Sequence, residues 1–178
     1  ASPVQKVIEL LDDLKGKVEA DLANEEKLMV KKIISGGQTG VDRAVLDAAM
    51  ELGISTGGWC CAGRSGMDGS IPEKYNTLQE AESSDYSVVT DWNIRDSDAT
   101  LILNLGPLTR DSKLCYDFAE DYKKPYLVCR FDAAISLPKV DEWLKKIAPK
   151  TLNIAGPREE ERPGIYEMSH GFLIQLLQ

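Results

Sequence analysis

The chain has 178 residues, of which 43% are hydrophobic and 28% are charged. This composition excludes wholesale disorder and low-complexity or collagen-like classes, and the length fits one domain with a short appendage. The formal net charge of −8 argues against nucleic acid or an anionic membrane as a partner, because both are bound by broad basic surfaces.

Residues 1–29 differ in pattern from the rest of the chain. Apolar residues recur at spacings of three and four, which predicts an amphipathic helix. Its apolar stripe consists of Val4, Val7, Ile8, Leu11, Leu14, Val18 and Leu22. Gly16 is expected to interrupt this helix. An isolated helix of this length is marginal in water, so we expect the extension to pack on the domain of residues 30–178 or on a second subunit.

From Lys31 onward, short β-branched runs alternate with helical patterns. The predicted strands cover residues 33–35, 55–61, 88–89, 100–105, 126–129 and 151–155. The predicted helices cover residues 41–52, 72–80, 112–121, 140–147 and 164–177, with a glycine-rich loop at 62–70 and a turn or short helix at 93–98. This alternation predicts an α/β three-layer domain, with helices on both faces of a mainly parallel sheet.

The first candidate site follows the first predicted strand. Between that strand and the next helix stand Gly36, Gly37, Gln38, Thr39 and Gly40. Glycine lets an anion approach bare N–H groups, and the helix N-terminus adds partial positive charge, so the turn indicates a phosphate or oxyanion site. The spacing matches neither a dinucleotide-binding fingerprint nor a Walker loop. The structural alternative is a tight turn capped by Thr39, with Asp42 completing a capping box.

Arginines supply the second signal, because five of them follow predicted strands. These are Arg43, Arg64, Arg110, Arg130 and Arg158. The carboxyl ends of parallel strands meet at one edge, where open α/β sheets bind ligands. Guanidinium groups suit phosphate, so we expect a small anion to bind at this edge. The alternative is pairing with neighbouring acids, and Arg130 and Arg158 are the strongest candidates for that structural role.

The segment before the central strand supplies the third signal. Asn93 is placed to line the same cleft, whereas Trp92 either stacks on a flat ring or fills the core. Asp96 and Asp98 are expected to cap a turn. The chain shows no nucleophile elbow, no triad and no carboxylate pair that stands out as general acid and base, so we predict no catalytic residue.

The four cysteines, Cys60, Cys61, Cys115 and Cys129, form no CxxC pair. With one histidine in the chain, a Cys/His zinc site is poorly supplied, and we predict no metal site. Reduced cysteines, the lack of a signal-peptide pattern and the lack of a long apolar run predict a cytoplasmic protein.

Four motifs, in this order, resemble the putative molybdenum carrier family, a Rossmann-like family related to the LOG and lysine-decarboxylase-like proteins. They are Ser35–Ala44, Gly58–Pro72, Trp92–Asp98 continuing to Leu103, and Leu152–Arg158 with Pro163–Tyr166. The resemblance covers about residues 30–178. It implies a Rossmann-like fold, a homo-oligomer (dimer or tetramer) and binding of molybdenum cofactor, a pterin that carries a phosphate.

One segment departs from the family's pattern. After the central strand the family has a turn of the type Ser-Gly-Gly-Thr, whereas residues 109–112 read Thr-Arg-Asp-Ser. Bulky side chains there block close approach to the backbone, although Arg110 can hold an anion with its side chain. The related phosphoribohydrolases carry the run Gly-Gly-x-Gly-Thr-x-x-Glu, which this sequence lacks.

We therefore expect a carrier of a phosphate-bearing cofactor, molybdenum cofactor or a nucleotide, rather than an enzyme. The predicted binding residues are Gly36, Gly37, Gln38, Thr39, Gly40, Arg43, Arg64, Asn93, Thr109, Arg110 and Ser112. The glycine turn would hold the phosphate and the arginines would neutralise it. Two alternatives stay open: a hydrolase that cleaves the N-glycosidic bond of a nucleoside monophosphate, using Asp111 or Asp117, and a non-catalytic sensor of a nucleotide.

Overall fold

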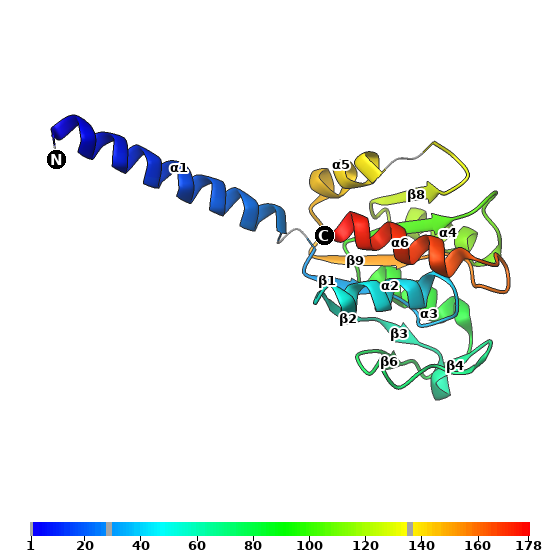
Figure 1. Cartoon of the computed structure of the whole chain (residues 1–178). Helices are drawn as coiled ribbons and strands as arrows, with labels where there is room; N and C mark the ends of the chain where they lie inside the picture. Colours follow the sequence, from blue (N-terminus) through cyan, green and yellow to red (C-terminus); the bar gives the residue numbers. More distant parts are fainter. Residues whose placement is uncertain (1, 28–29, 135–136) are drawn as a thin grey trace.

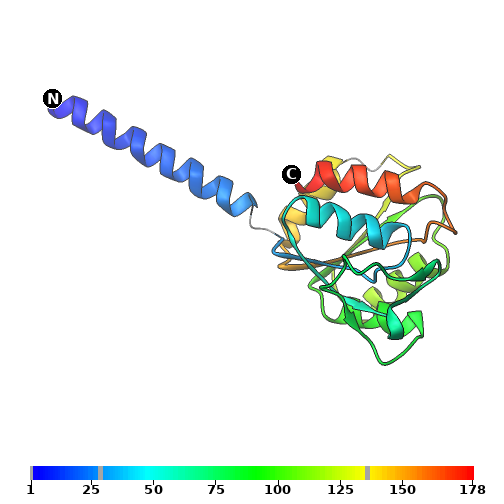
Figure 2. The same ribbon diagram turned by 60° about the horizontal axis from the view of Figure 1, so that its bottom comes forward.

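The computed structural model describes residues 2–27, 30–134 and 137–178. Its centre is a five-stranded sheet in which neighbouring strands run parallel. Helices cover both faces of this sheet (Figures 1 and 2), which confirms the predicted α/β three-layer architecture. Across the sheet the strands follow the order β2 (Ser55–Gly57), β1 (Lys32–Ile34), β9 (Thr151–Ala155), β7 (Ala99–Asn104) and β8 (Tyr126–Arg130).

Two groups of helices form the outer layers. One face of the sheet is covered by α2 (Val41–Glu51), α5 (Leu137–Ile147) and α6 (Ile165–Leu177). The other face is covered by α3 (Tyr86–Arg95) and α4 (Arg110–Asp121). Apart from α3, these helices lie within a few residues of the predicted ranges, because each carries an apolar face that the sheet buries.

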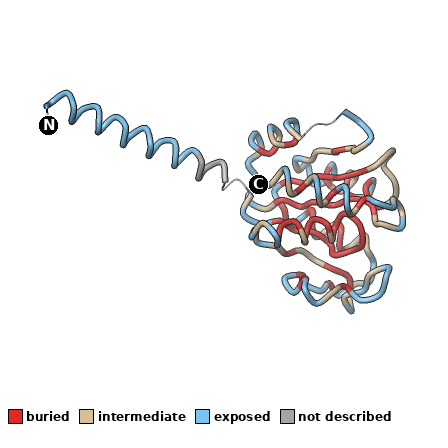
Figure 3. The backbone as a smooth tube through the Cα atoms, in the orientation of Figure 1, coloured by how far each residue is buried: buried red, intermediate tan, exposed pale blue. Residues whose placement is uncertain are grey.

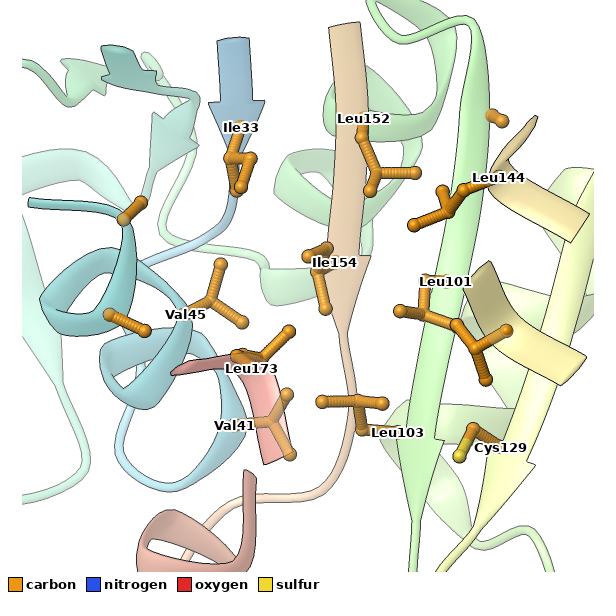
Figure 4. Packing of buried hydrophobic residues seen from close by; sticks show 14 of the residues in the cluster. Ile33, Val41, Val45, Leu101, Leu103, Cys129, Leu144, Leu152, Ile154 and Leu173 are labelled. Carbon is orange, nitrogen blue, oxygen red and sulfur yellow. The ribbon is translucent and has the colours of Figure 1, made fainter. Parts of the chain in front are cut away.

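Strand β7 shows how the sequence builds two cores. All of its residues are buried, as expected for a central parallel strand. Successive side chains point to opposite faces, so Leu101 and Leu103 join the core under α2, α5 and α6, whereas Ile102 joins the core under α3 and α4. Figure 4 shows the first core, where side chains of β1, β9 and β7 meet those of α2 and α6.

The order of the strands defines one special edge of the sheet. From β1 the chain passes through α2 to β2 at one side, and from β7 it passes through α4 to β8 at the other side. The last strand, β9, lies between β1 and β7. The carboxyl ends of β1, β9 and β7 therefore meet where the connections leave on opposite faces, which is where α/β sheets bind ligands.

The strand predicted over residues 55–61 is interrupted at Gly58. There the backbone has φ +119° and turns away from the sheet. Residues beyond it form β3 (Trp59–Cys60), which pairs with β6 (Gln79–Glu80) instead of continuing β2. The glycine-rich loop that follows contains the turn η1 (Ala62–Arg64) and the short pair β4 (Ser65–Gly66) and β5 (Gly69–Ser70).

The helix predicted over residues 72–80 is wrong. Successive tight turns replace it, and the Nη2 atom of Arg64 donates to the carbonyl oxygens of Pro72 and Tyr75 at 3.2 and 3.1 Å. Ile71, Tyr75 and Leu78 are buried in a small core with Leu46 of α2. Arg64 therefore binds backbone carbonyl groups that a helix would have bound, and burial of these side chains stabilises the non-helical conformation.

The strand predicted at residues 88–89 is also wrong, because both valines lie in α3. Asp85 caps this helix by accepting the N–H of Ser87 at 2.9 Å. Val89 is buried beside Cys61 and Ala81. A polar cap followed by a helical apolar face was the signal that outweighed two β-branched residues.

The N-terminal extension forms α1 (Pro3–Lys27), which projects away from the domain (Figures 1 and 2). Residues 2–22 are exposed, as Figure 3 shows, so the helix does not pack on its own domain as one of the two expectations had it. The expected break at Gly16 is absent from the described helix, since one glycine costs less than the surrounding turns supply. No described helix is both long and apolar enough to cross a membrane.

We predict that Gly16→Ala raises the helix content of α1. No described atom lies within 4 Å of the position that a Cβ would occupy at Gly16, so the substitution removes a glycine penalty of about 1 kcal/mol without a clash. Far-UV circular dichroism of the full chain measures the gain. Unchanged or lower helicity would contradict the continuous helix.

Candidate functional site

The glycine turn connects β1 to α2 at the carboxyl edge of the sheet. Gly37 and Gly40 both have φ +77°, a left-handed conformation that favours glycine. A Cβ at Gly40 would lie 2.6 Å from the carbonyl oxygen of Pro157 and from the backbone nitrogen of Glu159. The turn is therefore packed directly against the loop that follows β9.

The predicted capping box is wrong, because Gly40 occupies the N-cap position of α2 and supplies no side chain. Thr39 instead donates its hydroxyl to Glu160 at 2.5 Å. Asp42 accepts the N–H of Gln38 at 3.2 Å. Within the described residues, the N–H groups of Gly37, Thr39 and Gly40 donate to no protein acceptor, so they are available at the positive end of α2.

An open hollow of about 410 Å³ lies beside this turn. It is bordered by the turn with α2, by the turn between β4 and β5, by the loop between β5 and β6, and by the loop between β9 and α6 together with the start of α6. Its lining residues are Thr39, Gly40, Arg43, Asp47, Asp68, Pro72, Lys74, Tyr75, Glu159, Glu160 and Tyr166. The structure thus brings together three of the predicted binding residues, Thr39, Gly40 and Arg43, in one hollow.

Both cations in the lining are already paired with carboxylates. Arg43 binds both oxygens of Asp68, at 2.6 and 2.8 Å, and donates from Nε to the carbonyl of Gly37 at 3.1 Å. The ammonium of Lys74 lies 2.7 Å from Asp47. Since the lining also contains two glutamates, an anion that enters must share these cations with the carboxylates that hold them.

The two glutamates of the lining differ in their surroundings. Glu159 accepts the N–H groups of Gly164 and Tyr166 and so caps α6. Glu160 is exposed and accepts only the hydroxyl of Thr39 among the described residues. Glu160 is therefore the carboxylate of the hollow that is free to bind donors of a ligand.

A second, much smaller cavity of about 10 Å³ lies behind the turn, between the sheet and α3. Asp42 and Asn153 line it, and the Oδ1 atom of each is buried without a hydrogen-bond partner in the described chain. The volume suits one water molecule, which can donate to both oxygens. Burial raises the pKa of the Asp42 carboxyl to about 7, against the opposing hydrogen bond from Gln38.

Gly36 and Asn93 belong to this small cavity rather than to the hollow. A Cβ at Gly36 would lie 2.7 Å from Oδ2 of Asp42, so the glycine makes room for the carboxylate. The amide of Asn93 accepts the N–H of Trp59 at 2.8 Å and donates to its carbonyl at 3.0 Å. Asn93 therefore fastens β3 to α3.

Arg64 and the start of α4 also lie outside the lining. Arg64 donates hydrogen bonds to the backbone of Pro72 and Tyr75, which border the hollow. It therefore supports the wall of the hollow without lining it. At the start of α4, Ser112 accepts the N–H of Thr109 at 3.0 Å. Arg110 is exposed and pairs with none of the described residues. Arg43 therefore lies at the start of α2 inside the lining, whereas Arg110 lies at the start of α4 outside it.

The two arginines singled out for a structural role are paired with acids. Arg158 lies 2.7 Å from Asp111, whose side chain is almost fully buried, and Arg130 lies 2.6 Å from Asp132. Asp117 pairs with Lys113 along α4 at 2.8 Å. Because neither Asp111 nor Asp117 lines the hollow, the structure offers no support for their use in an N-glycosidic hydrolysis.

The remaining predicted polar residues have structural contacts. Trp92 packs edge-on against Trp59, with ring centroids 4.9 Å apart. Asp96 accepts from the indole of Trp59 at 2.7 Å, and Asp98 accepts the N–H groups of Lys150 and Thr151. All four cysteines are free and buried. Among the described residues, no three His, Cys, Asp or Glu side chains are grouped to hold a metal ion.

Sequence reasoning missed eight of the eleven lining residues, including Lys74, Tyr75, Glu160 and Tyr166. Lys74 and Tyr75 were assigned to a helix that does not form, so their approach to α2 was hidden. The signal for Glu160 was present, because it follows the last strand within the motif that ends at Arg158. The acidic run that contains it predicts partners for the neighbouring arginines just as well, so the sequence pattern alone does not single out Glu160.

A family model described as the circularly permutated YpsA SLOG family matches residues 33–177 of this chain. The chain is also similar to the crystal structure of a protein named "Putative molybdenum carrier protein" from Syntrophus aciditrophicus SB. The two share 44% sequence identity with a TM-score of 0.78, over 83% of this chain and 94% of that chain. Among curated proteins, none matches. These findings agree with the resemblance and with the Rossmann-like fold.

Proposed function

Because the chain belongs to the circularly permutated YpsA SLOG family, we propose that it binds and carries a phosphate-bearing cofactor, the molybdenum cofactor, in the hollow beside the glycine turn. One observation carries this proposal. The backbone N–H groups of Thr39 and Gly40, at the N-terminus of α2, have no partner among the described residues, and both residues line a hollow of about 410 Å³ beside the carboxyl end of β1. The similar protein from Syntrophus, named as a molybdenum carrier, supports the choice of cargo.

The phosphate fits the turn. Helix N-termini with free N–H groups bind phosphate through their donors and their partial positive charge. Arg43 and Lys74 reach the same hollow and add two cations. The volume lies in the usual range for small-molecule sites of roughly 300–1,000 Å³. The glycine turn, Arg43 and Lys74 are therefore assigned to the phosphate end of the cofactor.

The carboxylates of the hollow fit the other end of the cofactor. A pterin presents an amino group and a ring N–H side by side, and such a pair donates two parallel hydrogen bonds to one carboxylate. Glu160 is exposed at the rim and, among the described residues, accepts a hydrogen bond from Thr39 alone. Guanine presents the same pair of donors and adenine does not. The hollow therefore favours a pterin, and among nucleotides it favours guanine over adenine.

Native mass spectrometry of the 178-residue chain tests the proposal, with molybdenum cofactor, GMP and AMP added in turn. We expect one cofactor per chain and weaker binding of AMP than of GMP. Lys74→Ala and Glu160→Gln should each weaken the cofactor about tenfold, because each removes one charge-assisted contact. Both side chains are exposed, so the fold should tolerate the changes.

Arg110→Ala is the matched control, since Arg110 is also exposed at a helix N-terminus but lies outside the hollow. It should leave affinity unchanged. A loss confined to Arg110→Ala would move the phosphate to the start of α4 and refute the assignment to the glycine turn. Absence of any cofactor adduct would refute the carrier function. Binding of nucleotides alone would favour a nucleotide sensor.

A further inference from the structure

Helix α1 presents an apolar stripe that its own domain leaves uncovered. Side chains of Val7, Leu11, Leu14 and Val18 are 50–60% exposed. The helix spans 25 residues, about 37 Å at 1.5 Å per residue, and it projects outward in both views (Figures 1 and 2). Exposed apolar patches of this kind mark interaction surfaces.

We propose that α1 binds α1 of a second copy of this chain in an antiparallel pair, with Leu11 packed against Leu14 of the partner subunit. In this register Val7 meets Val18 of the partner subunit. The dyad symmetry repeats each contact once. The interface lies outside the hollow, so it does not depend on which ligand the domain carries.

The spacing of the stripe supports a two-helix seam. Val4, Val7, Leu11, Leu14 and Val18 follow the alternating steps of three and four that place residues on one side of a helix. A narrow stripe of this period packs best against another helix with the same period. A second copy of α1 supplies that stripe at equal length.

The charged side chains of α1 near the stripe favour the antiparallel orientation. Lys15, directly after Leu14, and Asp12, directly after Leu11, lie on the same side of the stripe. When the helices run antiparallel, Lys15 lies beside Asp12 of the partner subunit, and this pair occurs twice. When they run parallel in register, Asp21, which continues the steps of three and four after Val18, instead faces Asp21 of the partner subunit, and the two carboxylates repel each other. Antiparallel packing also aligns the helix dipoles favourably.

Light scattering coupled to size exclusion tests the pairing on the full chain. We expect a mass of about 39 kDa, twice the 19.6 kDa of one chain, falling to the monomer on dilution. Leu11→Glu with Leu14→Glu should give a monomer at every concentration, because it places charge in the seam. Ala20→Glu adds charge on the opposite face of α1 and should leave the dimer intact.

Disulfide trapping tests the orientation. Val7→Cys and Val18→Cys are made as separate variants, and the four native cysteines stay unreactive because they are buried. Under mild oxidation each variant alone should stay largely uncrosslinked, whereas a mixture of the two should form the mixed disulfide. Strong self-crosslinking of each single variant would establish a parallel pair and overturn the orientation.

Three other results overturn the proposal as a whole. A monomer at all concentrations would mean that α1 does not pair with its own copy. A dimer that survives the glutamate substitutions would place the interface on the domain. A mass of four chains would show that the stripe serves a larger bundle. Thermal melting of the domain, monitored by tryptophan fluorescence, should be the same in every variant, since α1 is exposed.

Discussion

Gly58→Ala should lower the free energy of unfolding by about 4 kcal/mol, combining roughly 1–3 kcal/mol of backbone strain with a similar cost of crowding. Gly58 has φ +119° at the point where the chain leaves the sheet. A Cβ there would lie 2.3 Å from the carbonyl oxygen of Ser35 and 2.8 Å from its nitrogen. Because both contacts are with backbone, no side chain can move aside to relieve them.

Gly69→Ala is the matched control for this substitution. Gly69 has φ +118°, but no described atom lies within 4 Å of its missing Cβ. It should therefore show the strain alone, about 2 kcal/mol. Urea unfolding of both variants measures the difference. Equal losses would show that the approach of Gly58 to Ser35 is not as close as the structure has it.

Asp42→Asn should stabilise the protein by about 4 kcal/mol above neutral pH, because it removes a charge from a buried site. The carboxyl of Asp42 is 2% exposed, and its pKa is raised from 3.8 to about 7 chiefly by burial. The asparagine oxygen can still accept the N–H of Gln38. The expected gain is the cost of ionising this buried group.

The pH dependence follows from the direction of this shift. A raised pKa in the folded state means that the folded chain holds the proton more tightly than the unfolded chain does. The stability from protonated Asp42 is complete below pH 3.8 and is lost as the pH rises through about 7. Between about pH 5 and about pH 7 the natural chain should lose roughly 2 kcal/mol relative to Asp42→Asn.

Denaturant unfolding of both chains across this range measures the difference. Carboxyls paired with cations, such as Asp68 and Asp96, have lowered pKa values and stay ionised throughout this range. They therefore contribute little to the change of the unfolding free energy with pH. Asp121→Asn removes an exposed carboxylate at the end of α4 and serves as the control substitution. If Asp42→Asn keeps the slope of the natural chain, the buried carboxyl is not its cause.

Asp42 also shows why the glycine turn was easy to find and hard to interpret. The glycines of this turn stand out in the sequence because they lie between a predicted strand and a predicted helix. Gly36, however, makes room for the carboxylate of Asp42, and Gly40 makes room for the loop after β9. Gly37 lies against Leu78 and Ile71. Close packing from distant segments decides these positions, and a local pattern cannot show it.

The sequence by itself determined the layered α/β architecture, because hydrophobic period and length distinguish buried parallel strands from amphipathic helices. It also determined α1 and the turn between β1 and α2, both of which depend on near neighbours in the chain. The structural role of Arg130 and Arg158 was also expected from the sequence, whereas the pairing of Arg158 with Asp111, 47 residues away, comes from the tertiary structure.

Only the tertiary structure decided which edge residues share a hollow. Arg43 and Lys74 meet because residues 71–78 fold onto α2 instead of forming a helix. Arg110 stands apart because β9 lies between β1 and β7, which separates the starts of α2 and α4. Strand order and loop packing arise from contacts between residues far apart in sequence, and such contacts leave no periodic trace in the chain.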